Sequence, residues 1–456
     1  MKLKKTMSVL LVLLMLVICF SACTAGGNSE GQKSGTDSSS SGNAVSESSA
    51  GQPEEAGDPG EKVTIEYYTW GDEEGYLAPI VDAFNAQSEH TIVHANYVPT
   101  GSDPDAYVNR VTALLAGGGE MDVFGSSTVK VMIAYRDGGS IADLTDAIKA
   151  AGIDLDGYGE DFASTLADGK CYALPYRFSS FALFYNKLIF DAEKIPYPEK
   201  MTWDEYAELA KSMTKTRDDG TTQWGGFIPD WMGEPILAVQ MGSSVLDENT
   251  EPLKNWLGLL GRLYNEDKSH MSFEEMRSTS VDWVDIFLRG DVAMLPNGEW
   301  TVGNAKQKLA DNPDLAGKCE IGIAYMPQPE GVQDPVTIGG HNTFILINKN
   351  SQKFDHAFEF VQYLTGAEGA KMLAEAGVLP SHIDDSTIDA FEKSAGISDV
   401  SPLFNSETHY EAAPVDIFSE VDTIWREEKE LYLIGEKTLD ETIDSFTQRR
   451  APILNK

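Results

Sequence analysis

Hydrophobic residues recur at two spacings that alternate along the chain. Residues 63–70 are rich in β-branched and aromatic side chains with partial alternation, which predicts a strand. Apolar residues at helical spacing follow between 77 and 84, then a second strand at 91–98, a second helix across 108–115 and a short strand at 121–124. This order predicts a βαβαβ unit, which winds a parallel sheet and places ligand-binding turns at the carboxyl ends of its strands.

The same two spacings continue to the C-terminal end. Residues 181–186 predict another strand, and the pattern Thr-Trp-Asp-Glu at 202–205 is a capping box that begins a helix. Helical spacing returns at 354–364 and 418–425, and a second capping box lies at 438–441. The alternation therefore predicts an α/β protein in which a second wound sheet follows the first.

The N-terminal 61 residues have a different character. Three lysines, an apolar stretch at 9–20 and small residues before Cys23 predict an export signal that is too short to span a membrane. The sequence Ser-Ala-Cys at 21–23 is similar to the lipobox of bacterial lipoproteins, which implies a lipid on the Cys23 sulfur; ordinary cleavage after residue 25 is the alternative. Residues 24–61 contain no Phe, Tyr, Trp, Leu or Ile, so we expect a flexible tether.

Charge and cysteine content narrow the classes of partner. The formal charge of −37 becomes more negative when the three signal lysines are removed, so nucleic acid and anionic lipid headgroups are not expected as partners. About 395 residues follow the tether, which is enough for two domains. Cys171 and Cys319 are the cysteines of this part; we expect two buried thiols, with a disulfide as the alternative.

Several stretches in order resemble one protein family. The most specific is Leu-Pro-Tyr-Arg-Phe-Ser-Ser-Phe-Ala-Leu-Phe-Tyr-Asn-Lys at 174–187. The others are the stretches at 114–124, 202–205, 290–294, 298–300, 339–341 and 435–443. Together they resemble the family 1 extracellular solute-binding proteins, the carbohydrate-binding lipoproteins of bacterial ABC importers. The resemblance covers the chain from 63 to about 450.

This resemblance implies a two-lobed clamp of the type II periplasmic-binding-protein class, with crossings between lobes near Ser179, Asn342 and Asp384. Hinge closure would bury a ligand between the lobes. It also implies a lipid-anchored monomer, outside the cytoplasmic membrane of a Gram-positive bacterium, that delivers an oligosaccharide to ABC permease subunits without catalysis, cofactor or metal. The implied segments are a signal peptide at 1–22, the lipidated cysteine and tether at 23–61, a first lobe at 62–178 and 342–384, and a second lobe at 179–341 and 385–456.

Aromatic side chains are the first candidates for sugar binding, because a sugar offers apolar C–H faces as well as hydroxyls. Trp70, Trp231 and Trp300 lie in Gly-, Pro- or Asp-containing turns that place them at strand ends. The resemblance implies that they stack on the ligand, and packing inside a lobe is the alternative. Tyr176 is a further candidate with both roles open. The tryptophans expected in the core are Trp203, Trp256, Trp283 and Trp425, which lie in or begin helical patterns.

Polar candidates lie close to these in sequence. Arg177, on the expected crossing, can hydrogen-bond two sugar hydroxyls or form an ion pair between the lobes. Asp72 and Glu299 adjoin candidate tryptophans and can accept hydroxyl donors, or serve as turn or helix-start carboxylates. The remaining candidates are Ser126 and Ser127, which follow a strand and can instead cap the next helix, and Gly340 and His341. With Gly339, Gly340 lets the backbone approach the ligand or bend at the hinge, and His341 follows this glycine pair.

Other classes of function stay open at this stage. A secreted glycoside hydrolase would also show aromatics and carboxylates, although no nucleophile or zinc motif occurs. A metal protein has weak support, because His90 and His94 in one strand lie too far apart to bind one ion. A binding protein for a peptide, polyamine or phosphate ester is the alternative that the sequence leaves most open.

Overall fold

The computed structural model describes residues 62–99, 106–158, 162–230, 232–233, 235–279, 281–410, 415 and 417–455. All of these residues belong to one compact unit, Asp58–Lys456. The expected signal peptide, Cys23, the tether and Trp231 lie outside the described residues.

The predicted βαβαβ unit is confirmed. Strand β1 (Val63–Trp70) pairs in parallel with β2 (Thr91–Val98) and with β3 (Val123–Ser126). Helix α2 (Glu74–Gln87) connects the first two strands, and α3 (Ala106–Gly117) precedes the third. The first two strands have the predicted bounds.

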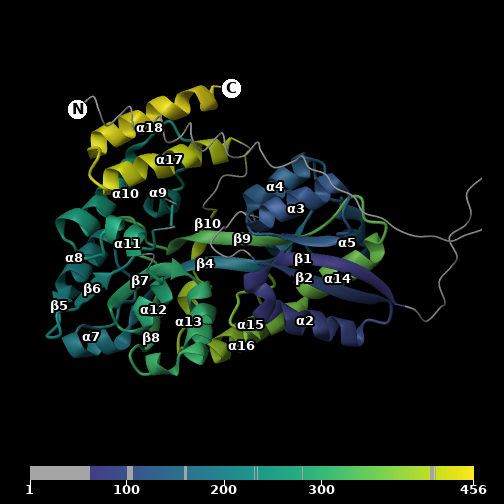
Figure 1. Cartoon of the computed structure of the whole chain (residues 1–456), viewed down its shortest axis with the longest axis horizontal. Coiled ribbons are helices and arrows are strands. Elements are labelled where there is room, and N and C mark those ends of the chain that lie inside the picture. Colours follow the sequence, from purple (N-terminus) through teal and green to yellow (C-terminus); the bar gives the residue numbers. More distant parts are fainter. Residues whose placement is uncertain are drawn as a thin grey trace, which may run out of the picture. The chain divides into compact units, whose positions relative to one another are not determined.

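The third strand begins two residues later than predicted. Asp122 directly precedes this strand, and its side chain accepts a hydrogen bond from the Glu66 backbone N–H of β1 at 2.9 Å. Helices cover both faces of the sheet (Figure 1): α3 and α4 (Val129–Asp137) lie on one face, and α2 and α14 (Phe354–Thr365) lie on the other. The buried side chains between these layers form a first core.

Two long strands leave this sheet and continue into a second one. β4 (Leu174–Asn186) and β9 (Val336–Ile347) pair antiparallel, and β4 then pairs with β7 (Val292–Gly298). The resulting strand order is β2-β1-β3-β9-β4-β7-β6-β5. The sequence predicted only the second half of β4, because the hydrophobic run at 181–186 belongs to the second core whereas residues 174–180 pair with β9.

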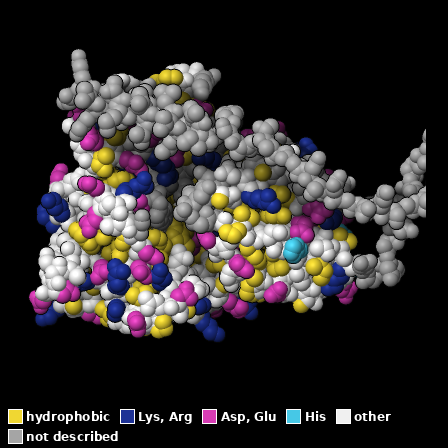
Figure 2. Space-filling model, viewed as in Figure 1, with side chains coloured by type: hydrophobic (Ala, Val, Ile, Leu, Met, Phe, Trp, Pro, Cys, Tyr) yellow, Lys and Arg dark blue, Asp and Glu magenta, His cyan; other side chains and the backbone are white. Residues whose placement is uncertain are grey.

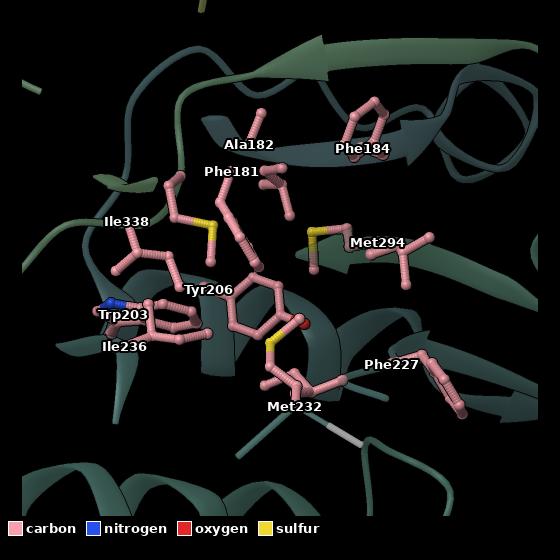
Figure 3. Close-up of a cluster of buried hydrophobic side chains, with 14 of the residues drawn as sticks. Phe181, Ala182, Phe184, Trp203, Tyr206, Phe227, Met232, Ile236, Met294 and Ile338 are labelled. Atoms are coloured by element: carbon pink, nitrogen blue, oxygen red, sulfur yellow. The ribbon is translucent and has the colours of Figure 1, made fainter. Parts of the chain in front are cut away.

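The second core surrounds the far ends of these strands. Figure 3 shows Phe181 and Met294 from β4 and β7 above Trp203 and Tyr206 from helix α8 (Trp203–Met213). The predicted capping box of this helix is present, with Thr202 and Glu205 bonding each other's backbone N–H groups. The Trp203 indole N–H donates to Gln240 at 2.8 Å.

The expected core tryptophans are largely confirmed. Trp203, Trp256 and Trp425 are buried, and Trp283 is half-buried against the same core. The smaller strands of this half are β5 (Lys215–Thr216), β6 (Thr222–Gly226), β8 (Ile321–Ala324) and β10 (Glu407–His409).

The remaining helices pack around the two cores. Helices α17 and α18 lie side by side and contact α10, and the predicted capping box of Thr438 and Glu441 begins α18. The helices are α5 (Thr145–Ala151), α7 (Lys187–Glu193), α9 (Ile236–Gln240), α10 (Glu251–Gly261), α11 (Phe273–Thr279), α12 (Trp283–Leu288), α13 (Trp300–Asp311), α15 (Ala367–Glu375), α16 (Asp385–Ala395), α17 (Phe418–Leu433) and α18 (Leu439–Leu454). Short turns of other helix types are η2 (Gly71–Glu73), η3 (Asp156–Tyr158), η4 (Arg262–Glu266), η5 (Pro313–Leu315) and η6 (Ser401–Leu403).

The two cysteines among the described residues are free thiols. Cys171 is buried and Cys319 is half-buried. Burial raises the pKa of Cys171 to about 11 and that of Cys319 to about 12, so both stay protonated at neutral pH. Within the described ranges, we find no helix of the length and apolar content needed to cross a bilayer.

The strand crossing between the two cores requires glycine. Ser179 of β4 lies opposite Gly340 of β9, and Ser180 lies opposite Gly339. Gly339 has φ of 150° and Gly340 has φ of 108°, conformations that side chains disfavour. A Cβ on Gly339 would lie 2.1 Å from the Ser179 carbonyl oxygen, so the two backbones touch only because no side chain is present.

We therefore expect Gly339→Ala to destabilise the protein by about 2–4 kcal/mol, since the new methyl group both clashes and disfavours this φ. The matched control is Gly75→Ala, because Gly75 lies in α2 and a methyl group added there would have nothing within 4 Å. That change should leave stability equal or raise it by up to about 1 kcal/mol. Urea unfolding measures both, and equal effects of the two substitutions would contradict the requirement for glycine.

Candidate functional site

The candidate site lies where the two long strands pass between the cores. Arg177 of β4 holds its guanidinium between two carboxylates that come from different parts of the chain. Its Nη1 donates to Glu73 Oε1 at 3.0 Å, and its Nη2 lies 3.6 Å from Glu299 Oε1. The guanidinium carbon also lies 5.6 Å from the centre of the Tyr76 ring. Arg177 is thus the centre of a compact polar cluster.

Glu73 is the most highly bonded member of this cluster. It ends the η2 turn directly after β1, and its side chain is almost fully buried. Thr69 and Tyr76 donate short hydrogen bonds to its carboxylate, and Tyr176 donates to Oε2 at 2.8 Å. With Arg177 these make four donor side chains on one carboxylate, which fixes its position.

Glu299 holds the other side of the guanidinium. It lies between β7 and α13, and only 1% of its side chain is exposed. Its Oε2 accepts a hydrogen bond from the Ser180 backbone N–H at 3.2 Å. Burial raises the pKa of Glu299 to about 7, although the nearby Arg177 charge acts in the opposite direction. This carboxyl group therefore titrates near neutral pH.

Several buried polar atoms around Glu299 have no hydrogen-bond partner among the described residues. They are Arg177 Nε, Ser180 Oγ, Asn297 Nδ2 and Glu299 Oε1. All four belong to β4, β7 or the residue after β7. The Glu299 side of the cluster is thus under-bonded, whereas the Glu73 side is saturated.

The two described candidate tryptophans share one arrangement. Trp70 ends β1 and Trp300 begins α13, and both indoles are partly exposed. A Cβ on Gly125 would lie 2.7 Å from the Trp70 ring, and a Cβ on Gly298 would lie 2.3 Å from the Trp300 ring. Each indole therefore lies against the backbone of a strand-end glycine.

An aromatic ring packs against each of these indoles. The Trp70 ring lies 4.3 Å from the Tyr107 ring at an angle of 31°. The Trp300 ring lies 5.1 Å from Phe181 at 89°, an edge-to-face contact. Part of each indole thus packs inward while part stays exposed.

The other predicted residues have more varied surroundings. Asp72 is exposed in the η2 turn, and Ser127 is exposed after β3. Ser126 is buried and donates to the Thr128 carbonyl at 2.9 Å. The alternative in which Ser126 or Ser127 caps the next helix is wrong, because Thr128 accepts the Val131 N–H and caps α4.

Tyr176 and His341 are buried side chains. The Tyr176 hydroxyl lies within hydrogen-bond distance of both Glu73 carboxylate oxygens, so it supports that carboxylate from within. His341 Nδ1 lies 3.0 Å from Ser381 Oγ, and its ring makes edge-to-face contacts with Tyr158 and Phe178. The residue before it, Gly340, forms part of the strand crossing.

The structure places all described candidates on five strands that are adjacent in the sheet, or in the turns after them. These strands are β1, β3, β9, β4 and β7. Sequence reasoning missed Glu73 and Tyr76, which contact Arg177 directly. A local signal existed for both, because Glu73 follows the expected turn residue Asp72 and Tyr76 directly precedes the next helical pattern.

No group of three or more metal-ligating side chains occurs within the described part of the chain. His94 instead lies 2.9 Å from Glu66 at an exposed position. The cluster around Arg177 thus offers hydrogen bonds and charge, and the indoles offer apolar planes.

Comparison with known proteins assigns the chain to a family. Residues 79–395 match the family described as bacterial extracellular solute-binding protein. The chain belongs to this family. Its α/β fold is that of the periplasmic binding proteins, as predicted from the sequence resemblance.

Individual relatives are distant. The chain is 22% identical to the melibiose/raffinose/stachyose-binding protein MelE of Bacillus subtilis, over 67% of this chain and 70% of the relative. It is 22% identical to the sn-glycerol-3-phosphate-binding periplasmic protein UgpB of Pectobacterium atrosepticum, over 85% of this chain and 90% of the relative. An ABC substrate-binding protein of Listeria monocytogenes in complex with cycloalternan has the same fold, with a TM-score of 0.73, 21% identity, and 86% and 99% of the two chains covered.

The raised pKa of Glu299 predicts a pH-dependent stability. Between its ordinary pKa of 4.5 and about 7, the folded protein keeps a proton that the unfolded chain has lost. The stability that protonated Glu299 adds to the folded state is therefore fully present below pH 4.5, and it is lost as the pH rises through 7. Glu299→Gln cannot ionise, so the stability difference between variant and parent should shift in favour of the variant from about pH 5 to about pH 8. Urea unfolding across this range measures it, and parallel pH curves would contradict the assignment.

Proposed function

We propose that this protein binds a carbohydrate outside the cell and delivers it to the permease of an ABC importer. The observation that carries the proposal is the pair of partly exposed indoles: Trp70 ends β1 and Trp300 begins α13, each within three residues of a carboxylate that pairs with Arg177. Aromatic planes suit the C–H faces of a sugar, and fixed polar groups suit its hydroxyls. Membership of the solute-binding family supports this proposal.

The charge of the cluster favours a neutral sugar over a phosphate ester. The two relatives named above differ in this respect, since one is named for melibiose, raffinose and stachyose and the other for sn-glycerol 3-phosphate. In this chain, Glu73 and Glu299 already oppose the positive charge of Arg177. A phosphate would be repelled by these two carboxylates, whereas a neutral sugar would meet no such repulsion.

The surface charge does not argue against this preference. On the face shown in Figure 2, acidic and basic side chains are interspersed and do not form one basic patch. A net charge of −37 acts on solubility and on encounter with charged molecules, and it adds no attraction for an anionic ligand. A hydroxyl-rich neutral ligand is thus the class that both the cluster and the surface accept.

Anchoring and delivery rest on the N-terminal sequence and on the family. Cys23 after a short apolar stretch supports a lipid anchor on the outer face of the cytoplasmic membrane, with the tether carrying a monomeric binding unit. Binding without turnover, cofactor or metal belongs to the same proposal. A secreted glycoside hydrolase is disfavoured by membership of a binding-protein family.

Removing one indole should weaken sugar binding without unfolding the protein. We expect Trp70→Ala and Trp300→Ala each to cost about 1–3 kcal/mol of binding free energy, the usual range for a buried aromatic contact. The probes are raffinose, maltotriose, mannotriose and sn-glycerol 3-phosphate, measured by isothermal titration calorimetry. Trp224→Ala is the control, since Trp224 is a half-buried tryptophan of β6 outside the site.

Two results of this titration would overturn the proposal. Tight binding of sn-glycerol 3-phosphate with no response to any of the three sugars would replace the carbohydrate by a phosphate ester. Unchanged sugar affinity in both Trp70→Ala and Trp300→Ala, with lowered stability, would make these indoles packing residues only.

The lipid anchor has its own test. Palmitate labelling of the exported protein should be lost in Cys23→Ala, because alanine has no sulfur to which the proposed lipid can attach, and the protein should leave the membrane fraction. Cys319→Ala is the matched control and should keep the label. Labelling that survives in Cys23→Ala would rule out anchoring at this residue.

A further inference from the structure

Arg177 contacts acidic side chains that belong to the two different cores. Glu73 follows β1 and lies with the first core, whereas Glu299 follows β7 and lies with the second. We propose that Arg177 is a positioning residue that ties the two cores together through Glu73 and Glu299, and thereby sets the affinity for the ligand. The effect on ligand affinity rests on the proposed function, whereas the contact of Arg177 with Glu73 and Glu299 does not.

The contact between Arg177 and Glu73 is held firmly by hydrogen bonds. Nη1 of Arg177 donates hydrogen bonds to Glu73 Oε1 at 3.0 Å and to the Tyr76 hydroxyl oxygen at 2.9 Å. Glu73 is in turn held by Thr69, Tyr76 and Tyr176. Because the carboxylate is 6% exposed and fully bonded, loss of the guanidinium would leave a buried charge with no cation beside it. Arg177 therefore moves with the first core.

The contact between Arg177 and Glu299 can change. Nη2 of Arg177 and Oε1 of Glu299 are 3.6 Å apart, which is an ion pair but not a hydrogen bond. Arg177 Nε, Ser180 Oγ and Asn297 Nδ2 beside it also lack partners within the described residues. Unsatisfied buried polar groups carry a free-energy cost, so a small shift of one core against the other can relieve it. The contact that changes with such a shift is the one between Arg177 and Glu299.

Protonation offers a way to vary this contact. The charged or titratable groups that face Glu299 and Arg177 are Glu73, Tyr76 and Tyr176, and burial raises the pKa of both tyrosines well above the ordinary value. They stay neutral at physiological pH, so Glu299 is the group that changes charge near pH 7. An ionised Glu299 attracts Arg177, and a protonated one does not. The tie is thus stronger above pH 7 than below it.

The experiment compares variants of the full mature chain at about pH 5.5 and about pH 8.5, on either side of the Glu299 titration. Small-angle scattering without ligand reports the arrangement of the two cores, and calorimetry with the best of the four probes reports affinity. The variants are Arg177→Gln, which removes the charge, Arg177→Lys, which keeps the charge but loses the planar fork, and Glu299→Gln, which mimics the protonated acid. Arg217→Gln is the matched control, because Arg217 pairs with Asp291 within one half of the molecule.

The four variants should give different results. At the higher pH, Arg177→Gln should bind about ten- to a hundredfold more weakly than the parent and should show a larger radius of gyration, because freed halves must be ordered on binding. Arg177→Lys should recover part of the affinity. Glu299→Gln should behave at both pH values as the parent does at the lower pH, whereas Arg217→Gln should match the parent throughout.

Other outcomes would overturn the proposal. Unchanged scattering and affinity in Arg177→Gln would show that no tie exists. Weakened binding with the parent's scattering and pH dependence would show that Arg177 binds the ligand directly. If Arg177→Gln does not fold, Glu299→Gln provides the test. A pH dependence of this variant as large as that of the parent would refute the tie. Absence of binding to every probe would refute the proposed ligand, while the pH dependence of ligand-free scattering would still test the tie.

Discussion

The molecule depends on a close antiparallel contact between two strands that serve both cores. β4 and β9 carry the sheet from the first core to the second, and Gly339 lies against the Ser179 carbonyl where they pass. The strands approach this closely because residue 339 has no side chain, and residue 340 has a backbone conformation that favours glycine. Both cores are therefore built on the same pair of strands, and a change at their crossing affects both.

The crossing also explains the position of the polar cluster. Arg177 lies two residues before Ser179 on β4, where the strand still belongs to the first sheet but its side chain reaches groups from both cores. A guanidinium has five donors in a rigid plane, so it can face two carboxylates from opposite sides. Burial strengthens these contacts and also makes incomplete ones costly. Glu73, which accepts from four donors, therefore fixes Arg177 in place, whereas the contact of Arg177 with Glu299 is incomplete.

The two candidate indoles, Trp70 and Trp300, also depend on glycines that lack a side chain. Gly125 and Gly298 each leave room for an indole ring to lie on the backbone of a strand end. Tyr107 and Phe181 support these rings from within the cores. A partly exposed tryptophan that is held on one side and open on the other suits stacking against a sugar ring. The chain belongs to the family of bacterial extracellular solute-binding proteins, and binding at these indoles is part of the proposed function.

Sequence alone determined the elements whose causes are local. The first two strands and the capping boxes at Thr202 and Thr438 follow from spacing and cap chemistry, which act within a few residues. The candidates at strand ends also came from sequence, although their role in binding and the lobe boundaries stay predictions. Only the tertiary structure decided how those residues interact, because Arg177 and Glu73 are 104 positions apart and no local pattern could pair them. The full extent of β4 likewise depends on which strand lies alongside, and the charge state of Glu299 depends on burial, which does not exist in the extended chain.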